Sequence, residues 1–201
     1  MTRMRLATVL LAPAALLSLS ACGVNTIPTA EEKAKAEWAD VQAAFQRRAN
    51  LIPNLVETVK ASATSEERIL TGVTQARADA TRITVSPDDL DDPAAMQRYS
   101  EAQARLSAAI IPLQRLQEAY PDLKSQQNFA TLMSQLEGTE NRINIAIQDY
   151  NQAVQAYNTE IRTFPSVIGA KVIYGAEPMV PYQAVTPGAE VAPTVDFGTS
   201  K

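Results

Sequence analysis

The stretch QNFATLMSQLEGTENRINIAIQDYNQAVQAYNTEIRTFP, residues 127–165, decides the fold of this chain. Its large side chains recur every seven residues, in two rows. The first row consists of Phe129, Leu136, Ile143, Tyr150, Tyr157 and Phe164, and the second consists of Met133, Glu140, Ile147, Val154 and Ile161. A seven-residue repeat in two rows is typical of a helix that packs along one seam, as in a coiled coil. We therefore expect one long helix that Pro165 ends.

Two tyrosines of the first row, Tyr150 and Tyr157, are each followed by an asparagine. Both share their row with leucine, isoleucine and phenylalanine, so we expect the two rings to be buried in the seam. The alternative is a ladder of exposed aromatic side chains that binds a ligand.

A second long helix is expected from Thr29 to about Ser62. Its large side chains again fall seven residues apart, at Trp38, Phe45, Ile52 and Val59. Pro53 lies inside this pattern and should kink the helix, because it leaves the carbonyl of Ala49 without its helical donor. A capping-box pattern follows at Thr64 and Glu67, which indicates a break or a shift of phase.

Another helix should begin at Asp92, which has the character of an N-cap, and Pro93, which suits the first helical position. It runs to about Tyr120. Together these patterns predict an all-α fold: an elongated antiparallel bundle of three to four long helices in residues 30–165. Residues 166–201 are rich in Pro and Gly and are expected to form an irregular tail.

The N-terminus has the features of an export signal. Residues 1–21 combine two arginines with a short apolar run, as in a secretory signal peptide. They end in Leu19, Ser20 and Ala21 before Cys22, a sequence that resembles the lipobox of bacterial lipoproteins. We expect fatty acids such as palmitate on Cys22 and a tether over residues 22–29. The alternative is an ordinary cleaved signal beside a stray cysteine.

Two or more acyl chains anchor a protein to a bilayer without a membrane-spanning helix. The chain is thus expected on the cell membrane or the outer membrane, with its body outside the cytoplasm. In a cell that has an outer membrane, the body would lie in the periplasm.

The residue inventory excludes several classes of protein. The chain has no histidine and one cysteine, so it can form neither a Ser-His-Asp nor a Cys-His nucleophile, nor a His or Cys zinc site. Its 22 acidic and 18 basic residues form no basic stripe, which argues against nucleic acid as a partner. No phosphate-binding glycine loop is present. We expect no catalytic residue, no metal and no cofactor.

Polar side chains interrupt the helical patterns at a few positions. Arg48 and Glu140 each stand in an otherwise apolar row, and an antiparallel register would bring them together as an interhelical pair. Alternatively, one or both charges reach the surface on long stems. Asn144, Asn151 and Asn158 fall seven residues apart beside the seam. We expect this amide row to form hydrogen bonds across a helix interface; the alternative is that it lines a groove for a partner.

Four separated motifs together resemble the LemA family of bacterial envelope proteins. They are FQRRANLIPNLVETVKA (45–61), EAYPDLKSQQNFATL (118–132), EGTENRI (137–143) and YNQAVQAYNTEIRTFP (150–165). The resemblance implies an elongated antiparallel α-helical bundle in a membrane-associated protein outside the cytoplasm. It implies no catalytic residues, and it usually implies a transmembrane helix where this chain has a lipobox.

Two functions follow as hypotheses. The first is a lipid-anchored, non-enzymatic scaffold or adaptor whose partners are other envelope proteins. The second is a membrane-organising protein that associates with itself on the bilayer as a homo-oligomer.

Overall fold

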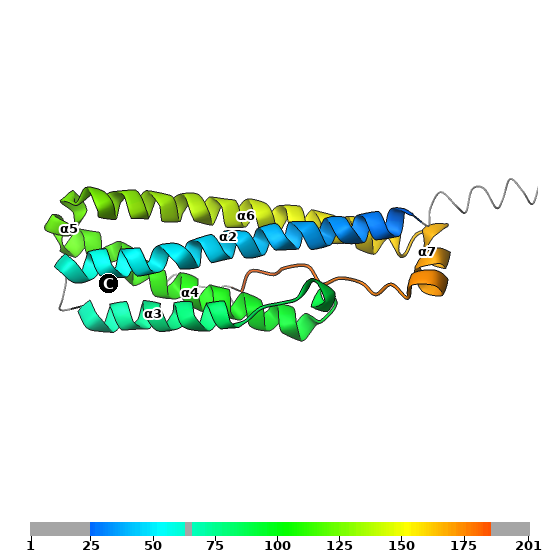
Figure 1. Ribbon diagram of the computed structural model, residues 1–201, viewed down its shortest axis with the longest axis horizontal. Coiled ribbons are helices and arrows are strands. Elements are labelled where there is room, and N and C mark those ends of the chain that lie inside the picture. Colours follow the sequence, from blue (N-terminus) through cyan, green and yellow to red (C-terminus); the bar gives the residue numbers. More distant parts are fainter. Residues whose placement is uncertain (1–24, 63–65, 186–201) are drawn as a thin grey trace, which may run out of the picture.

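The computed structural model describes residues 25–62 and 66–185, and in this part of the chain four long helices form an elongated bundle (Figure 1). The long helices are α2 (Thr26–Ser62), α3 (Glu67–Arg82), α4 (Pro93–Ala119) and α6 (Gln127–Glu160). The short elements are η2 (Pro87–Asp89), α5 (Pro121–Ser125), α7 (Ser166–Gly169) and η3 (Ala170–Tyr174), of which η3 is a π-helical turn. The described residues contain no strand, which confirms the predicted all-α class.

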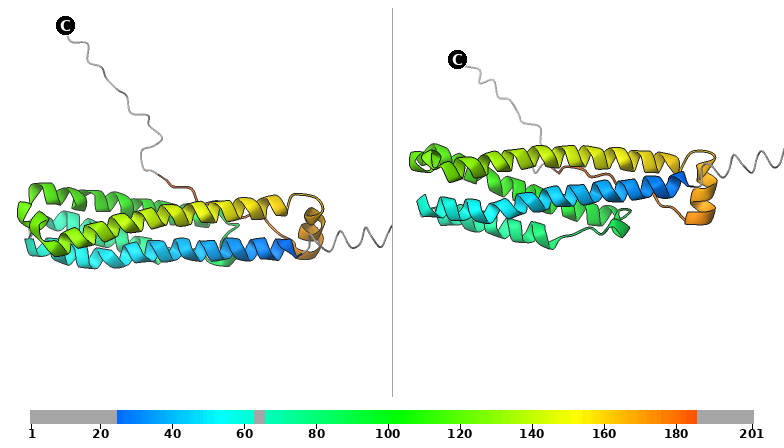
Figure 2. Two further views of the ribbon diagram at one scale, coloured as in Figure 1. Left: turned by 90° about the horizontal axis from the view of Figure 1, so that it is seen from above. Right: turned by 45° about the horizontal axis from the view of Figure 1, so that its top comes forward.

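Neighbouring helices run antiparallel (Figures 1 and 2). Helices α2 and α6 lie side by side along the whole rod, while α3 and α4 form a second pair that covers the part of the rod nearest α5. Helix α2 has 37 residues and is therefore about 55 Å long. The start of α2 and the end of α6 lie at the same end of the rod, together with α7.

The core has an aromatic and an aliphatic half. In the aromatic half, the Trp38 ring lies 5.3 Å from the Tyr99 ring and 5.1 Å from the Tyr150 ring, measured between centroids. The aliphatic half, nearer α5, contains Leu106 and Leu113. Tyr150 and Tyr157 are 0% and 3% exposed, so both tyrosines are seam residues, as their row predicts.

The ends of two long helices differ from expectation. Helix α6 ends at Glu160, five residues before Pro165, because the chain turns there through bonds such as Arg162 N to the Thr159 carbonyl. Phe164 has therefore left the seam and is 81% exposed, so its placement in the first row was wrong. Helix α2 begins earlier than expected, at Thr26, which makes part of the expected tether helical.

Pro53 leaves α2 continuous, and the carbonyl that it frees is used. Arg77 of α3 donates from Nε to the oxygen of Ala49 at 2.7 Å, which joins the two helices at that point. Helix α2 ends at Ser62 and α3 begins at Glu67, but Thr64 of the expected capping box lies outside the described residues.

Asp92 caps α4 as predicted, accepting a bond from Ala94 N at 2.8 Å.

The expected irregular tail is only partly irregular. Residues 166–174 form α7 and η3, and the turn ends at Gly175, whose φ of 58° suits glycine. Residues 176–185 are extended and run back along the bundle (Figure 2). We call residues 176–185 the C-terminal segment.

Candidate binding groove between α4 and α6

Asn151 and Asn158 on α6 hold the C-terminal segment by its backbone. Asn158 Nδ2 donates to the Met179 carbonyl at 2.8 Å, and Met179 N donates to Asn158 Oδ1 at 2.9 Å. Asn151 repeats this arrangement with Tyr182, at 3.0 and 2.8 Å. Each amide therefore pairs with both backbone groups of one residue, as a neighbouring β-strand would.

The spacing of the amides matches the spacing of an extended chain. Seven residues of α-helix advance about 10.5 Å, and three residues of an extended strand advance about 10 Å. Asn158 and Asn151 accordingly contact Met179 and Tyr182, which are three residues apart. This register explains why asparagine, a poor helix former, recurs at a seven-residue interval.

Further contacts fix the same segment. Tyr150 Oη donates to the Val180 carbonyl at 2.8 Å, and Val180 N donates to the carbonyl of Leu90 at 2.8 Å. The Tyr182 ring lies 5.9 Å from the Phe45 ring, and burial raises the pKa of Tyr182 to about 12. The amides thus bind an extended segment of chain rather than another helix, which was the expected partner. The expected alternative, a groove, describes them better, although its occupant here is the chain itself.

The third amide, Asn144, is exposed and lies near residue 185, the last described residue of the C-terminal segment. The three-for-seven register places residue 185 opposite it. Among the described residues, Asn144 forms no amide to backbone pair of the kind made by the other two. It lines a pocket of about 340 Å³ together with Ile111, Ile147 and Val185. The groove therefore continues past residue 185, the last described residue of the C-terminal segment.

Arg48 and Glu140 form one wall of this pocket, and the structure brings them together. Arg48 Nη1 lies 3.1 Å from Glu140 Oε1 and donates to Ser107 Oγ at 2.7 Å. Its Nη2 donates to the carbonyl of Gln103 at 3.2 Å and to its Oε1 at 2.8 Å. Arg48 is 1% exposed, with its guanidinium 5.0 Å above the centre of the Phe45 ring.

The bonds of Arg48 connect α2, α4 and α6 at one point. Glu140 is 41% exposed at its side chain, so the pair is buried on the arginine side only. Sequence reasoning missed Gln103 and Ser107, the partners from α4. The available signal was a pair of polar residues four apart beside the apolar rows of that helix.

The model of the LemA family matches residues 37–197, which is well over half of the chain. The chain belongs to the LemA family. It is also similar to two curated proteins of Paramagnetospirillum magneticum, magnetosome protein MamQ 1 and magnetosome protein MamQ 2. Each is 26% identical over 157 residues, an alignment that covers 70% of this chain and 58% of the relative. The LemA-family chain thus matches somewhat more than half the length of these relatives.

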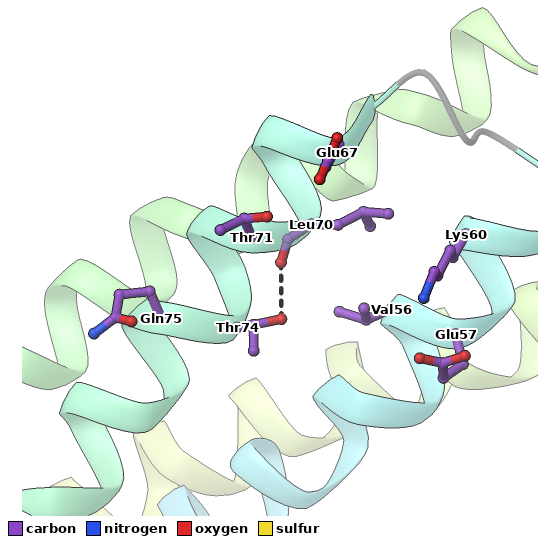
Figure 3. Close-up of a pocket in the computed structure, with 8 residues that line it drawn as sticks. All are labelled: Val56, Glu57, Lys60, Glu67, Leu70, Thr71, Thr74 and Gln75. Atoms are coloured by element: carbon purple, nitrogen blue, oxygen red, sulfur yellow. Dashed lines mark hydrogen bonds between the residues drawn. The ribbon is translucent and has the colours of Figure 1, made fainter.

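A larger pocket of this LemA-family bundle, about 460 Å³, lies between α2 and α3 (Figure 3). Glu57, Lys60 and Glu67 stand at its rim, and the Thr74 hydroxyl inside it already donates to the carbonyl of Leu70 at 2.8 Å. In the described part of the chain, no three metal-binding side chains gather, here or elsewhere. This pocket therefore offers less specific chemistry than the amide row.

The predicted lipid attachment site lies outside the described residues. This applies to Cys22 and to Leu19, Ser20 and Ala21 of the lipobox. Among the helices that the structure describes, none is long and apolar enough to cross a membrane.

Proposed function

We propose that this LemA-family protein is a lipid-anchored, non-enzymatic adaptor that binds an extended segment of another envelope protein in the groove between α4 and α6. One observation carries the proposal. The groove already holds an extended chain through a periodic row of amides, and it continues past residue 185 to the next amide, Asn144, beside a pocket.

The chemistry of the groove suits binding. Asn151 and Asn158 form their hydrogen bonds with backbone groups, which every peptide offers, so these bonds provide affinity without selecting a sequence. Selectivity would come from the pocket, where Ile111 and Ile147 favour an apolar side chain and Glu140 disfavours an acidic one. A binding role needs none of the nucleophiles that the residue inventory lacks.

The location of the adaptor is inferred from its relatives and its N-terminus. Membership of the family and the likeness to magnetosome proteins support a membrane-associated envelope protein. Cys22 behind the lipobox would supply the anchor. Replacing it, Cys22→Ala, should abolish labelling by radioactive palmitate and release the protein from the membrane fraction. A Cys22→Ala protein that is still labelled and retained in the membrane would contradict this anchor.

The groove can be tested by site-specific cross-linking in intact cells. A photoreactive amino acid is placed at Ile111, on the pocket wall and 46% exposed, and in a matched control at Ile145, 50% exposed and lining a different surface of α6. We expect the probe at Ile111 to cross-link to one envelope protein, and all its cross-links to fall within one extended segment of that protein. A synthetic copy of that peptide should then bind the purified protein and lose affinity in Asn144→Leu.

Three outcomes would contradict the adaptor. Equal cross-linking from both positions would show that the groove has no special role. Cross-links from Ile111 to residues 186–201 of the same chain alone would show that the protein fills its own groove. Cross-links to a second copy would favour the membrane-organising hypothesis, in which the protein associates with itself.

A further inference from the structure

Exposed apolar side chains gather at the end of the rod formed by α7 and η3. Of the seven large hydrophobic residues that are exposed in the described part of the chain, five belong to this end. They are Phe164 (81%), Ile168 (57%), Val172 (79%), Ile173 (61%) and Tyr174 (42%). We call these five residues the apolar tip. Soluble monomers seldom concentrate exposed apolar side chains in this way without a partner for them.

The apolar tip is attached to the beginning of α2. The carboxylate of Glu160, the last residue of α6, accepts bonds from Thr26 Oγ1 and, at 2.5 Å, from Ser166 Oγ. These two bonds, first that of Ser166 and then that of Thr26, lower the pKa of Glu160. The first residue of α2 and the first residue of α7 therefore share one partner, and both lie at the same end of the rod (Figures 1 and 2).

The position of Thr26 limits how far this end can be from a bilayer. Thr26 is the fourth residue after Cys22, and four residue steps span at most about 14 Å. An anchor at Cys22 thus keeps the start of α2 close to the lipid surface, and with it the apolar tip. This step rests on the lipid anchor of the proposed function; the groove is not involved.

We propose that the apolar tip inserts into the interfacial region of the bilayer as a second membrane contact. Tyr174 is of a residue type that, with tryptophan, is enriched where the bilayer meets water, and Phe164 adds a large apolar ring. The neighbouring Arg162 and Lys171 are exposed cations suited to lipid phosphates, and Glu160 is already occupied by its two hydroxyl partners. Exposed acids lie on the side of the tip that faces the bundle: Glu177, Asp88 and Asp91 line one pocket with Tyr174.

The consequence is a fixed orientation. One lipid-bearing cysteine on a short tether would let the rod lean in any direction, whereas a second apolar contact at the same end restricts that motion. Tip and anchor act together, because a side chain held near the bilayer needs no further loss of translational freedom to insert.

The test uses full-length acylated protein in vesicles of phosphatidylethanolamine and phosphatidylglycerol. Cys22 is the only cysteine and is blocked by its lipid, so Val172→Cys can be labelled alone with an environment-sensitive fluorophore. Ile145→Cys, on the exposed side of α6, serves as the matched control. We expect the fluorophore on Val172→Cys to show a blue-shifted emission and to be quenched by spin-labelled lipid. The fluorophore on Ile145→Cys should show neither effect. Adding Ile173→Asp to Val172→Cys should remove much of the shift and the quenching.

The outcomes separate this inference from the anchor. If the fluorophore also reacted with Cys22, the lipid would be missing and the proposed anchor would be contradicted. Quenching at Val172→Cys is a separate measurement and reports only on insertion of the apolar tip. Anchored protein whose label at that position stays in a polar, unquenched environment would overturn the insertion. A blue shift that depends on the ratio of protein to lipid, without quenching by spin-labelled lipid, would overturn it in favour of contact between two copies.

Discussion

Removing the amides of Asn151 and Asn158 should release the C-terminal segment while the helices stay folded. Each substitution by alanine deletes two hydrogen bonds to backbone, and one such bond contributes about 1 kcal/mol net. Alanine returns roughly 0.6 kcal/mol through its higher helix propensity. Each single variant should therefore lose about 1.5 kcal/mol of stability.

The double variant should lose less than twice that amount. Both amides hold the same segment, so once it detaches at one contact the other contact is already weakened. A total of about 2 to 3 kcal/mol corresponds to an increase of roughly 30-fold to 150-fold in the population of the detached segment. Hydrogen exchange of the Val180 backbone amide, whose bond to the Leu90 carbonyl neither substitution removes, measures this population. Chemical denaturation measures the remaining stability of the bundle.

The control is Asn141→Ala, which changes an exposed asparagine of the same helix. It should leave exchange in the C-terminal segment unaltered and raise stability slightly. If Asn151→Ala combined with Asn158→Ala gave the same exchange rates as this control, the amide row would not hold the segment and the groove would lose its basis. Asn158→Asp is a sharper probe, because it keeps the acceptor for Met179 N but sets an oxygen against the Met179 carbonyl; it should cost more than Asn158→Ala.

Further substitutions and a titration test the core around the groove. Arg48→Met should lower the free energy of unfolding by about 3 kcal/mol in a denaturant melt, because Arg48 is buried and also bonds to α4. Glu140→Gln should lower it by less than about 1 kcal/mol, because Glu140 is partly exposed. For the same reason, combining Arg48→Glu with Glu140→Arg should recover little of the stability that Arg48→Glu loses alone. Full recovery would show that the two residues interact mainly with each other. Tyr150→Ala should cost about 3 to 5 kcal/mol and Tyr150→Phe only about 1, for the lost bond to Val180; equal losses would contradict burial as the main effect. Burial raises the pKa of Tyr182 from 10.0 to about 12. The neutral phenol therefore contributes fully to the free energy of unfolding below pH 10, and this contribution is lost as the pH rises through 12. In melts across this pH range, Tyr182→Phe should remove the part of the stability loss that comes from ionisation of Tyr182.

The seven-residue repeat predicted most of the bundle because it is a local property of each helix. It identified α6 and the burial of Tyr150 and Tyr157, which depend only on the periodicity of the sequence and on a neighbour to pack against. Its failure at Phe164 has a physical cause. The repeat states which face a residue would occupy in a helix, but the chain left the helical path at Glu160, before that position.

The partners of polar side chains were harder to predict, since they come from distant parts of the chain. Arg48 and Glu140 could be paired because both are charged residues in apolar rows, and an antiparallel register aligns them. Gln103 gave no comparable signal, although it makes two bonds to Arg48. The partners of Asn151 and Asn158 lie 31 and 21 residues further along the chain, in a segment without periodicity.

The groove and the apolar tip together define where a partner would meet this protein. From Glu160 to Asn144 the helix advances about 24 Å, so with the tip in the bilayer the pocket at Asn144 lies roughly that far from the lipid surface. A peptide that continued the C-terminal segment would run from there toward α5, away from the membrane, since the segment itself runs in that direction (Figure 1). A partner anchored in the same bilayer would need about seven extended residues to reach the pocket. Shortening such a tether below this length should abolish binding on the membrane while leaving binding of the free peptide intact, and equal loss of both would show that distance from the bilayer does not limit the interaction.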